Sequence, residues 1–351
     1  MGQAGGSAIR PWIFEFFHAP GNPAQDAAPE VAAAHFTACL ALWQSAEPLG
    51  FDGIFFSEHH FGPGYSPSPN LLIAALAQRT RTLRLGVMGL VLPYYQPWRV
   101  VEEIGMLDHL TGGRLEIGTS SGIPQEMALI GLDVPEASAR NAEAQAILDA
   151  GLRDGVVNHH GKYWQIENLR LVPRPFQRPS PPRWTTVVSS ESARRSAQRG
   201  TKICTGFHPV ERVRHIFDAF REEAERCGGP AGPDQLAIRR TVSIDADEGA
   251  ARAASRRAAE ALRAVLARDP RVTEHPLPDA PGPAHNFSVG EEEFIAGAPE
   301  SVAEQIIVQC RAVGAGHFLA NFGRGKSPEA MRRNYTLFGE RVIPLLRTAL
   351  V

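Results

Sequence analysis

Residues 51–62 read FDGIFFSEHHFG, and within them the side chains change abruptly from apolar to ionisable. The first half is typical of a buried strand, and the second half places a serine, a glutamate and two histidines directly after it. Two further apolar runs, at 83–92 and 115–118, also end in polar or tyrosine residues. Segments of helical spacing separate the three runs. Parallel α/β folds carry their sites at the carboxyl ends of strands, and this pattern predicts such a fold.

Strand-type runs continue through the whole chain, and most are followed by a segment of helical spacing. The runs lie at residues 12–17, 51–56, 83–90, 115–118, 183–188, 202–204, 236–244 and 317–321. This repetition within 351 residues predicts an α/β fold in the form of a (β/α)8 TIM barrel with insertions. A doubly wound open sheet is the alternative. No G-x-G-x-x-G follows the first strand, which disfavours a dinucleotide fold of that kind.

The chain organisation predicts one barrel domain over residues 11–351, preceded by a disordered Gly- and Ala-rich tail at 1–10. Residues 155–183 are rich in proline and predict an irregular excursion with one short hairpin around Lys162-Tyr163-Trp164. Residues 265–292 lack periodicity and are rich in Pro, His, Asp and Gly. We interpret them as a candidate mobile lid; an inert surface loop fits the same composition equally well.

Composition excludes several classes of protein. The formal net charge of -2 gives no reason to expect nucleic acid as a partner, and no apolar run reaches the roughly 20 residues needed to span a bilayer. The four cysteines are far apart and form no C-x-x-C pair, and the first ten residues contain no secretory signal. We therefore expect a cytoplasmic protein with reduced thiols.

His59 and His60 are the strongest candidates for chemistry. Histidine exchanges protons near neutral pH, and a pair directly after a strand points its rings in different directions, so one of them is expected to face the barrel mouth. We expect His18 and Tyr94 to line the same mouth as substrate-binding residues. A metal site would need further ligands, so no metal is predicted. Two satisfied structural histidines are the competing interpretation.

Two small turns after strands are candidate anion sites. Ser189, Ser190 and Ser192 open a helix after the fifth strand and offer hydroxyls, backbone N–H groups and the positive helix end. Ordinary helix capping explains the same serines. Ser120 and Ser121 follow the fourth strand, and in a barrel both turns would face one rim and share one anion.

Two further segments contain glycine, and the backbone geometry of glycine can explain both. Gly89 inside the third strand predicts a bulge, or a close approach of the backbone to a flat ligand. A plain core strand followed by exposed tyrosines fits the same stretch equally well. The segment 108–114, DHLTGGR, looks like a motif, but its glycines end a helix and Asp108 or Arg114 can tie the turn. We interpret that segment as structural.

Together these segments resemble the bacterial luciferase-like flavin monooxygenase family. The matching segments are 51–53 with 58–61, 89–93, 107–114 with 117–118, 189–193, 298–302 and 341–344. Each segment alone is weak, but they fall in the family's order along nearly the whole chain. They identify the family far better than they identify a substrate.

The resemblance implies a luciferase-like barrel that binds reduced FMN at its carboxyl-terminal rim. There the flavin would react with O2 to a flavin hydroperoxide that oxygenates a small organic substrate. The implied catalytic residue is His59, supported by His60. The implied cofactor-binding residues are Met88, Gly89, Ser120, Ser121, Ser189, Ser190 and Ser192.

The sequence also departs from the family. Ser120 stands where the light-emitting α subunit carries a reactive cysteine, and Ser121 stands where it carries a phosphate-binding arginine. These departures argue against light emission and leave the phosphate one positive charge short. Arg194 or Arg195 would compensate if either faced the phosphate, and either fits solvent equally well.

No nicotinamide site is visible, so the resemblance implies that a separate NAD(P)H flavin reductase supplies the reduced FMN. A deazaflavin-dependent hydride-transfer enzyme of the same superfamily is the alternative. A flavin-binding accessory subunit is a third reading, disfavoured by the presence of His59, His60 and the serine turn. Family members commonly pair their barrels, so a homodimer is expected. Pocket loops vary too much for the sequence to indicate the substrate.

Overall fold

The computed structural model describes residues 7–21, 27–62, 64–266, 289–323 and 326–351. Its main sheet has the strand order β10-β9-β11-β1-β2-β3-β4-β7-β8, and β8 also pairs with β9, which closes a parallel barrel. The predicted TIM barrel is therefore confirmed. All eight predicted strands are present, as β1 (Arg10–Glu15), β2 (Gly53–Phe56), β3 (Arg84–Val91), β4 (Leu115–Ser120), β7 (Arg183–Thr186), β8 (Lys202–Gly206), β9 (Leu236–Ile244) and β11 (His317–Asn321).

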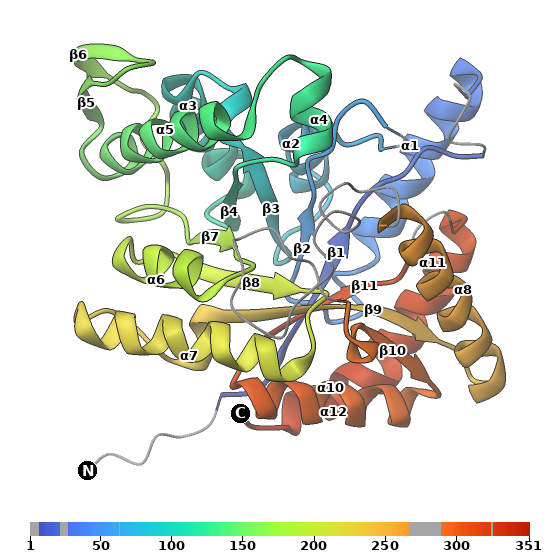
Figure 1. The fold of residues 1–351 in the computed structure, drawn as a ribbon. Helices are drawn as coiled ribbons and strands as arrows, with labels where there is room; N and C mark the ends of the chain where they lie inside the picture. The colour runs from blue at the N-terminus through green and yellow to red at the C-terminus, as the bar shows by residue number, and fades with distance from the viewer. Residues whose placement is uncertain (1–6, 22–26, 63, 267–288, 324–325) are drawn as a thin grey trace. The chain divides into compact units, whose positions relative to one another are not determined.

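Helices alternate with these strands along the chain, as the colours of Figure 1 show. In the described residues they are α1 (Pro29–Gln44), α2 (Pro69–Ala77), α3 (Pro97–Thr111), α4 (Pro124–Leu129), α5 (Val134–Asp154), α6 (Ser190–Gln198), α7 (Val210–Arg226), α8 (Glu248–Leu266), α10 (Pro299–Val313), α11 (Pro328–Leu337) and α12 (Ile343–Thr348). Short 3-10 turns are η1 (Leu92–Tyr94), η2 (Pro233–Gln235) and η3 (Glu291–Glu293), and η4 (Phe338–Val342) is a π-helical turn.

The described residues group into two compact units. Unit 1 comprises Met1–Glu15, Ala28–Ile54 and Thr186–Val351, and unit 2 comprises Phe16–Ala27 and Phe55–Thr185. The predicted lid falls largely on residues 267–288, and most of the predicted tail on 1–6, both outside the described residues. Arg10, the last residue of the predicted tail, begins β1. The predicted domain boundaries themselves stay predictions.

In unit 2, β3 pairs with β4 and β4 pairs with β7, all parallel. Helix α3 begins at Pro97, the predicted first-turn position, and ends at Gly112, whose φ of 63° is the left-handed conformation that glycine adopts without strain. The predicted hairpin is present as β5 (Val156–His160) and β6 (Gln165–Arg170), which lie beside α5 in Figure 1. These elements hold the strand ends after β2, β3 and β4 in place.

In unit 1, β1 pairs with β11, β11 with β9, and β9 with β8, again all parallel. One strand of this unit was not predicted: β10 (Phe294–Gly297) pairs with β9. Its four residues are too few to show a periodic pattern. Glu293, directly before it, is fully buried and forms ion pairs with Arg239 at 2.9 Å and Arg240 at 3.4 Å. This buried cluster fixes the start of β10 against β9.

The described helices include none whose length and hydropathy would suit a membrane crossing. All four cysteines are free, and three of them are buried. Burial raises the pKa of the thiols of Cys39, Cys204 and Cys310 to about 12. These three thiols therefore stay protonated and serve as small apolar side chains.

Candidate active site

Glu58 connects β2 to the two histidines that follow it. Its side chain is fully buried, and Glu58 Oε1 lies 2.9 Å from His60 Nε2. The other oxygen, Oε2, accepts a hydrogen bond from the backbone N–H of Val91 at 3.3 Å, at the end of β3. A buried carboxylate is stable only with partners of this kind. Glu58 thus joins the ends of two neighbouring strands and orients the His60 ring.

Glu126 orients the His59 ring, as Glu58 orients the His60 ring. Its Oε1 atom lies 3.0 Å from His59 Nδ1 and also accepts from the backbone N–H of His60 at 3.1 Å. An ionised carboxylate can only accept, so this bond places a proton on His59 Nδ1. The Nε2 atom then remains available, and no bond to it occurs in the described part of the chain. The His59 side chain is 35% exposed, twice the 18% of His60.

Sequence reasoning missed Glu126. It lies in the short helix α4, which was not predicted, and is separated from His59 by 67 positions. The available signal was an acidic residue in the segment that follows β4, which ends at Ser120, on the same barrel rim as the histidines. We call Glu58, His59, His60, Tyr94 and Glu126 the histidine cluster; all five belong to unit 2.

Tyr94 completes the histidine cluster. Its ring packs edge-on against the His60 ring at a centroid distance of 5.3 Å. Burial raises the pKa of Tyr94 to about 12, and the charges of Glu126 and Glu58 act in the same direction. The hydroxyl is buried and has no hydrogen-bond partner among the described residues. Tyr94 therefore holds a neutral O–H group ready for a bound ligand.

The charge of His60 is set by its surroundings. The hydrogen bond that the His60 ring donates to Glu58 raises the pKa of His60 above its ordinary 6.5, burial opposes that shift, and the charges of Glu58 and Glu126 add to it. His60 therefore holds a proton more firmly than a free histidine does. His59 is the more exposed of the two rings, and the supporting role of His60 stays a prediction.

His18 reaches this group through an aromatic contact. The Phe16 ring stacks on His59 at 5.6 Å and on His18 at 5.9 Å, with interplanar angles of 25° and 22°. The backbone of His18 also forms an isolated bridge with Gly64. The structure thus brings four of the predicted residues, His18, His59, His60 and Tyr94, into one neighbourhood.

The predicted bulge in β3 is confirmed. The register between β3 and β4 shifts between Val87 and Leu90, and the Met88–Gly89 peptide bond is cis. A Cβ atom on Gly89 would lie 2.7 to 2.9 Å from backbone atoms of Thr119, closer than atoms can pack. Only glycine fits here. Beside it, the Ser120 hydroxyl donates to the carbonyl of Gly89 at 3.3 Å, while Ser121 is exposed.

The predicted serine turn belongs to unit 1. Ser189 is the N-cap of α6, and Ser189 Oγ accepts from Ser192 N at 3.2 Å while Ser192 Oγ accepts from Ser189 N. This reciprocal capping box occupies both hydroxyls, whereas Ser190 stands at the first helical position. Arg194 and Arg195 are exposed and pair with Glu222 and Glu191, respectively. Capping is thus observed, and phosphate binding by this turn stays a prediction.

The segment 108–114 is structural, as predicted. Asp108 accepts hydrogen bonds from the backbone and side-chain N–H groups of Gln177 at 2.6 and 2.7 Å. Arg114 donates to the carbonyls of Thr111 and Leu83, both at 2.7 Å. These bonds tie α3 to the chain that enters β4 and leave no group for catalysis.

The residues of unit 2 fit a flat, polar ligand such as a flavin. Among the buried polar atoms that lack a hydrogen-bond partner in the described residues, four lie in or shortly after barrel strands of this unit: Ser57 Oγ, Tyr94 OH, Gln125 Oε1 and Thr185 Oγ1. They come from the ends of β2 and β7 and from segments just after β3 and β4. Buried polar atoms cost free energy unless a partner satisfies them. With the glycine bulge, they form a donor and acceptor set on one strand-end rim.

Comparison with known proteins identifies the family. The family model described as luciferase-like monooxygenase matches residues 13–317. An uncharacterized protein of Sinorhizobium fredii is 44% identical over 187 residues, 52% of this chain and 54% of its own length. The oxygenase component of a flavin-dependent trigonelline monooxygenase from Acinetobacter baylyi is 30% identical over 222 residues, 62% of this chain and 61% of its own. The chain thus spans little more than half the length of these relatives. The alkanal monooxygenase alpha chain of Photobacterium leiognathi is 26% identical over 88% of this chain and 92% of its own.

Solved structures agree on the fold. The monooxygenase RslO1 of Streptomyces bottropensis has a TM-score of 0.81 at 23% identity, covering 96% of this chain and 99% of its own. The oxygenating constituent of 3,6-diketocamphane monooxygenase from Pseudomonas putida, solved with FMN, has a TM-score of 0.75 at 22% identity over 96% and 98%. A coenzyme F420 dependent tetrahydromethanopterin reductase from Methanopyrus kandleri has 0.70 at 21% over 97% and 99%. At these identities the likeness establishes the barrel alone.

Proposed function

This chain belongs to the luciferase-like monooxygenase family, and from that premise we propose that it is a flavin-dependent monooxygenase using reduced FMN. The reaction would consume a small organic substrate, O2 and reduced FMN, and would yield the oxygenated substrate, water and oxidised FMN. The observation that carries the proposal is the His59–Glu126 pair, which leaves His59 Nε2 available, in the same histidine cluster as the unpartnered Tyr94 hydroxyl.

Reduced FMN, when bound, supplies the electrons and the activated oxygen. The chain's own groups hold the protons. Glu126 fixes the His59 ring, so that His59 Nε2 can accept a proton from, or return one to, a group bound at the rim. Tyr94 donates a hydrogen bond from a hydroxyl that stays neutral at any ordinary pH. Phe16, stacked on His59, shields this histidine from water on one side.

The predicted cofactor contacts divide between the units. In unit 2, Met88 and Gly89 would lie behind the flavin ring, at the bulge where the register between β3 and β4 shifts. Ser120 and Ser121 would bind the flavin from the next strand end. In unit 1, Ser189, Ser190 and Ser192 would offer the backbone N–H groups of the first turn of α6, since two of the three hydroxyls already cap the helix.

The wider assembly is part of the same proposal. A relative named as an oxygenase component supports a separate flavin reductase as the source of reduced FMN. We extend the proposal to a homodimer, which rests on the family alone. Hydride transfer with a deazaflavin is the alternative function, favoured by the barrel's likeness to a coenzyme F420 dependent enzyme.

One experiment separates these functions. Purified protein is titrated under anaerobic conditions with reduced FMN and, in parallel, with a reduced deazaflavin, and then mixed rapidly with O2 while flavin absorbance is recorded. The proposal predicts saturable binding of reduced FMN and a reoxidation time course that differs from that of free flavin. Binding of the deazaflavin without binding of FMN would reverse the assignment.

A further inference from the structure

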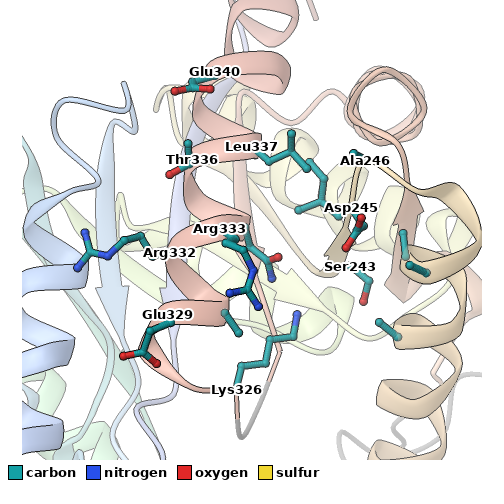
Figure 2. A pocket seen from close by; sticks show the side chains of 16 residues that line it. Ser243, Asp245, Ala246, Lys326, Glu329, Arg332, Arg333, Thr336, Leu337 and Glu340 are labelled. Atoms are coloured by element: carbon teal, nitrogen blue, oxygen red, sulfur yellow. The ribbon is translucent and has the colours of Figure 1, made fainter.

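A pocket in unit 1 is lined by none of the residues assigned above. It lies where β9 ends, between α8 and the helix formed by α11 and η4, and has a volume of about 800 Å³ (Figure 2). Its walls carry apolar side chains from three elements, among them Ile244 of β9, Ala250 and Ala254 of α8, and Leu337 of α11. A cavity of this size and lining accommodates a small ligand with an apolar body.

Lys326 is the unusual group in this pocket. Figure 2 shows its side chain pointing into the cavity, and a carbon added to Gly323 would lie 3.6 Å from Lys326 Nζ, so the amine sits just beyond the end of β11. No hydrogen bond or ion pair to this amine exists in the described residues. Burial lowers the pKa of Lys326 to about 8, and no charge among the described residues contributes to that shift. Lys326 is only half-buried by solvent exposure, but a partly buried cation without a counterion is still costly for the fold.

The presence of lysine rather than arginine at position 326 bears on what the pocket can bind. Lys162, Lys202 and Lys326 are the only lysines among the 36 Lys and Arg residues of the chain. Lys162 lies over the Tyr163 ring, and Lys202 pairs with Asp234 at 3.8 Å. Of the three, only Lys326 lines this pocket. Unlike arginine, lysine can lose its proton when buried, so an empty pocket tolerates it and an anion restores its charge.

The other charged groups of the pocket do not neutralise Lys326. On the β9 side, Asp245 Oδ1 accepts from the backbone N–H of Asp247 at 3.0 Å. On α11, Glu329 points away from the lysine amine in Figure 2, and its pKa is lowered by its own backbone N–H and by Ser327. Arg332 and Arg333 on α11 add positive charge, and Glu340 lies in η4, beyond α11. Among the described residues, no carboxylate of the pocket forms an ion pair with the Lys326 amine.

We propose that this pocket binds a small amphiphilic organic anion, a carboxylate or phosphate ester on an aliphatic body, with Lys326 as the cation that anchors its head group. The anionic head bonds to the Lys326 ammonium, with Arg333 as a second donor, and the body packs against the alanines of α8 and Leu337. None of the residues that line this pocket is among those proposed for flavin binding or oxygenation.

Binding couples to protonation. A bound anion favours the charged form of Lys326, so binding raises the lysine pKa and takes up a proton when it occurs above about pH 8. Affinity is therefore greatest below the free pKa and falls as the pH rises past it. A neutral ligand of the same shape shows no such dependence.

The test uses the full-length protein with no flavin added and its lysines labelled with 15N, since three lysines give three assignable signals. Octanoate is the probe, with octanol as the neutral analogue, and octyl phosphate and inorganic phosphate as the phosphate arms. We expect the Lys326 pKa to start near 8 and to rise by at least one unit with octanoate or octyl phosphate, but not with octanol.

Two variants at Lys326 and one control sharpen the result. Lys326→Met weakens octanoate binding about 10-fold to 100-fold, the usual range for loss of a charged hydrogen bond. Lys326→Arg keeps binding but loses its decline above pH 8, and Lys162→Met, at an exposed lysine, leaves both unchanged. A Lys326 that titrates at its ordinary 10.5, octanoate binding that survives Lys326→Met, or binding of inorganic phosphate alone would each overturn the proposal.

Discussion

The histidine cluster of unit 2 and the Lys326 pocket of unit 1 differ in whether their basic side chains have an acidic partner. In the cluster, His59 and His60 each lie about 3 Å from a carboxylate, at 3.0 and 2.9 Å. In the pocket, Lys326 has no acid in contact among the described residues. The pKa of His60 is raised by its carboxylate, whereas the pKa of Lys326 is lowered by burial. The carboxylates of the cluster hold the histidine rings in place for proton transfer, whereas the proposed partner of Lys326 is a bound anion.

His59→Ala tests the paired site with the largest expected effect. Loss of a proton-transfer group lowers kcat by about 10²-fold to 10⁴-fold. We expect that loss in single-turnover assays, with the affinity for reduced FMN changed little because Met88 and Gly89 remain. His160→Ala, at an exposed hairpin histidine, is the matched control. Equal activity in the two variants would remove His59 from the mechanism.

Lys326→Met tests the unpaired site through stability. Between about pH 8 and 10.5 the unfolded chain binds more protons than the folded one, so the free energy of unfolding rises with pH in that window. The methionine removes this penalty. It should stabilise the protein at neutral pH by at most about 3 kcal/mol and abolish the rise.

Urea denaturation at about pH 7 and pH 10 measures this effect. Lys202→Met is the matched control, because Lys202 has an acidic partner, Asp234, at 3.8 Å; that variant should gain no stability. A Lys326→Met protein less stable than the wild type at neutral pH would mean that the pocket already satisfies the amine.

Glu126→Gln separates orientation from catalysis within the cluster. Glutamine still accepts from the His60 N–H but no longer carries charge toward His59 Nδ1. A charged hydrogen bond contributes about 1.5 to 3 kcal/mol, so kcat should fall about 10-fold to 100-fold. Its pH profile should shift as well, a change that a merely structural role would not produce.

The control for that variant is Glu136→Gln, at a half-exposed glutamate that pairs with Arg140 at 2.8 Å on α5. It should change kcat by no more than about 2-fold, since exposed pairs contribute little. If Glu126→Gln behaved in the same way, His59 would not depend on its carboxylate.

Glu58→Gln carries the smallest expected effect and concerns His60. Replacing a buried carboxylate that accepts from His60 and Val91 costs about 1 to 3 kcal/mol of stability. In the wild type, the raised His60 pKa adds stability that is full below about pH 6.5 and is lost as the pH rises through the folded-state pKa. That loss should vanish in the variant. NMR titration of His60 and denaturation on both sides of pH 6.5 measure it; an unchanged His60 pKa would contradict the assignment.

Local patterns made the strands and several site residues visible in the sequence. Phe51 to Phe56 is apolar and then stops at Ser57-Glu58-His59-His60, so both the strand and the candidate residues were evident. Gly89 inside a strand indicated a bulge, which the register between β3 and β4 confirms. The β10 strand escaped notice because four residues carry no readable period.

Those local patterns could not identify which distant residue contacts a given site residue. Nothing near His59 in the chain marks Glu126 as its partner, because the contact spans 67 positions. Likewise, Ser189 and Ser192 suggested an anion site or a cap, and only the geometry of the capping box showed that the cap exists. The spacing of residues along the sequence indicates which face of a helix or strand a residue occupies. It does not indicate which distant side chain contacts that residue.

The sequence by itself determined the barrel, its family and the position of His59 and His60 at a strand end, because hydrophobic periodicity and short motifs are local properties of the chain. Only the tertiary structure decided the charge states. Burial and through-space contacts raise the pKa of His60 beside Glu58 and lower that of Lys326 in its pocket. Those quantities depend on distances between segments far apart in sequence, and the fold sets these distances.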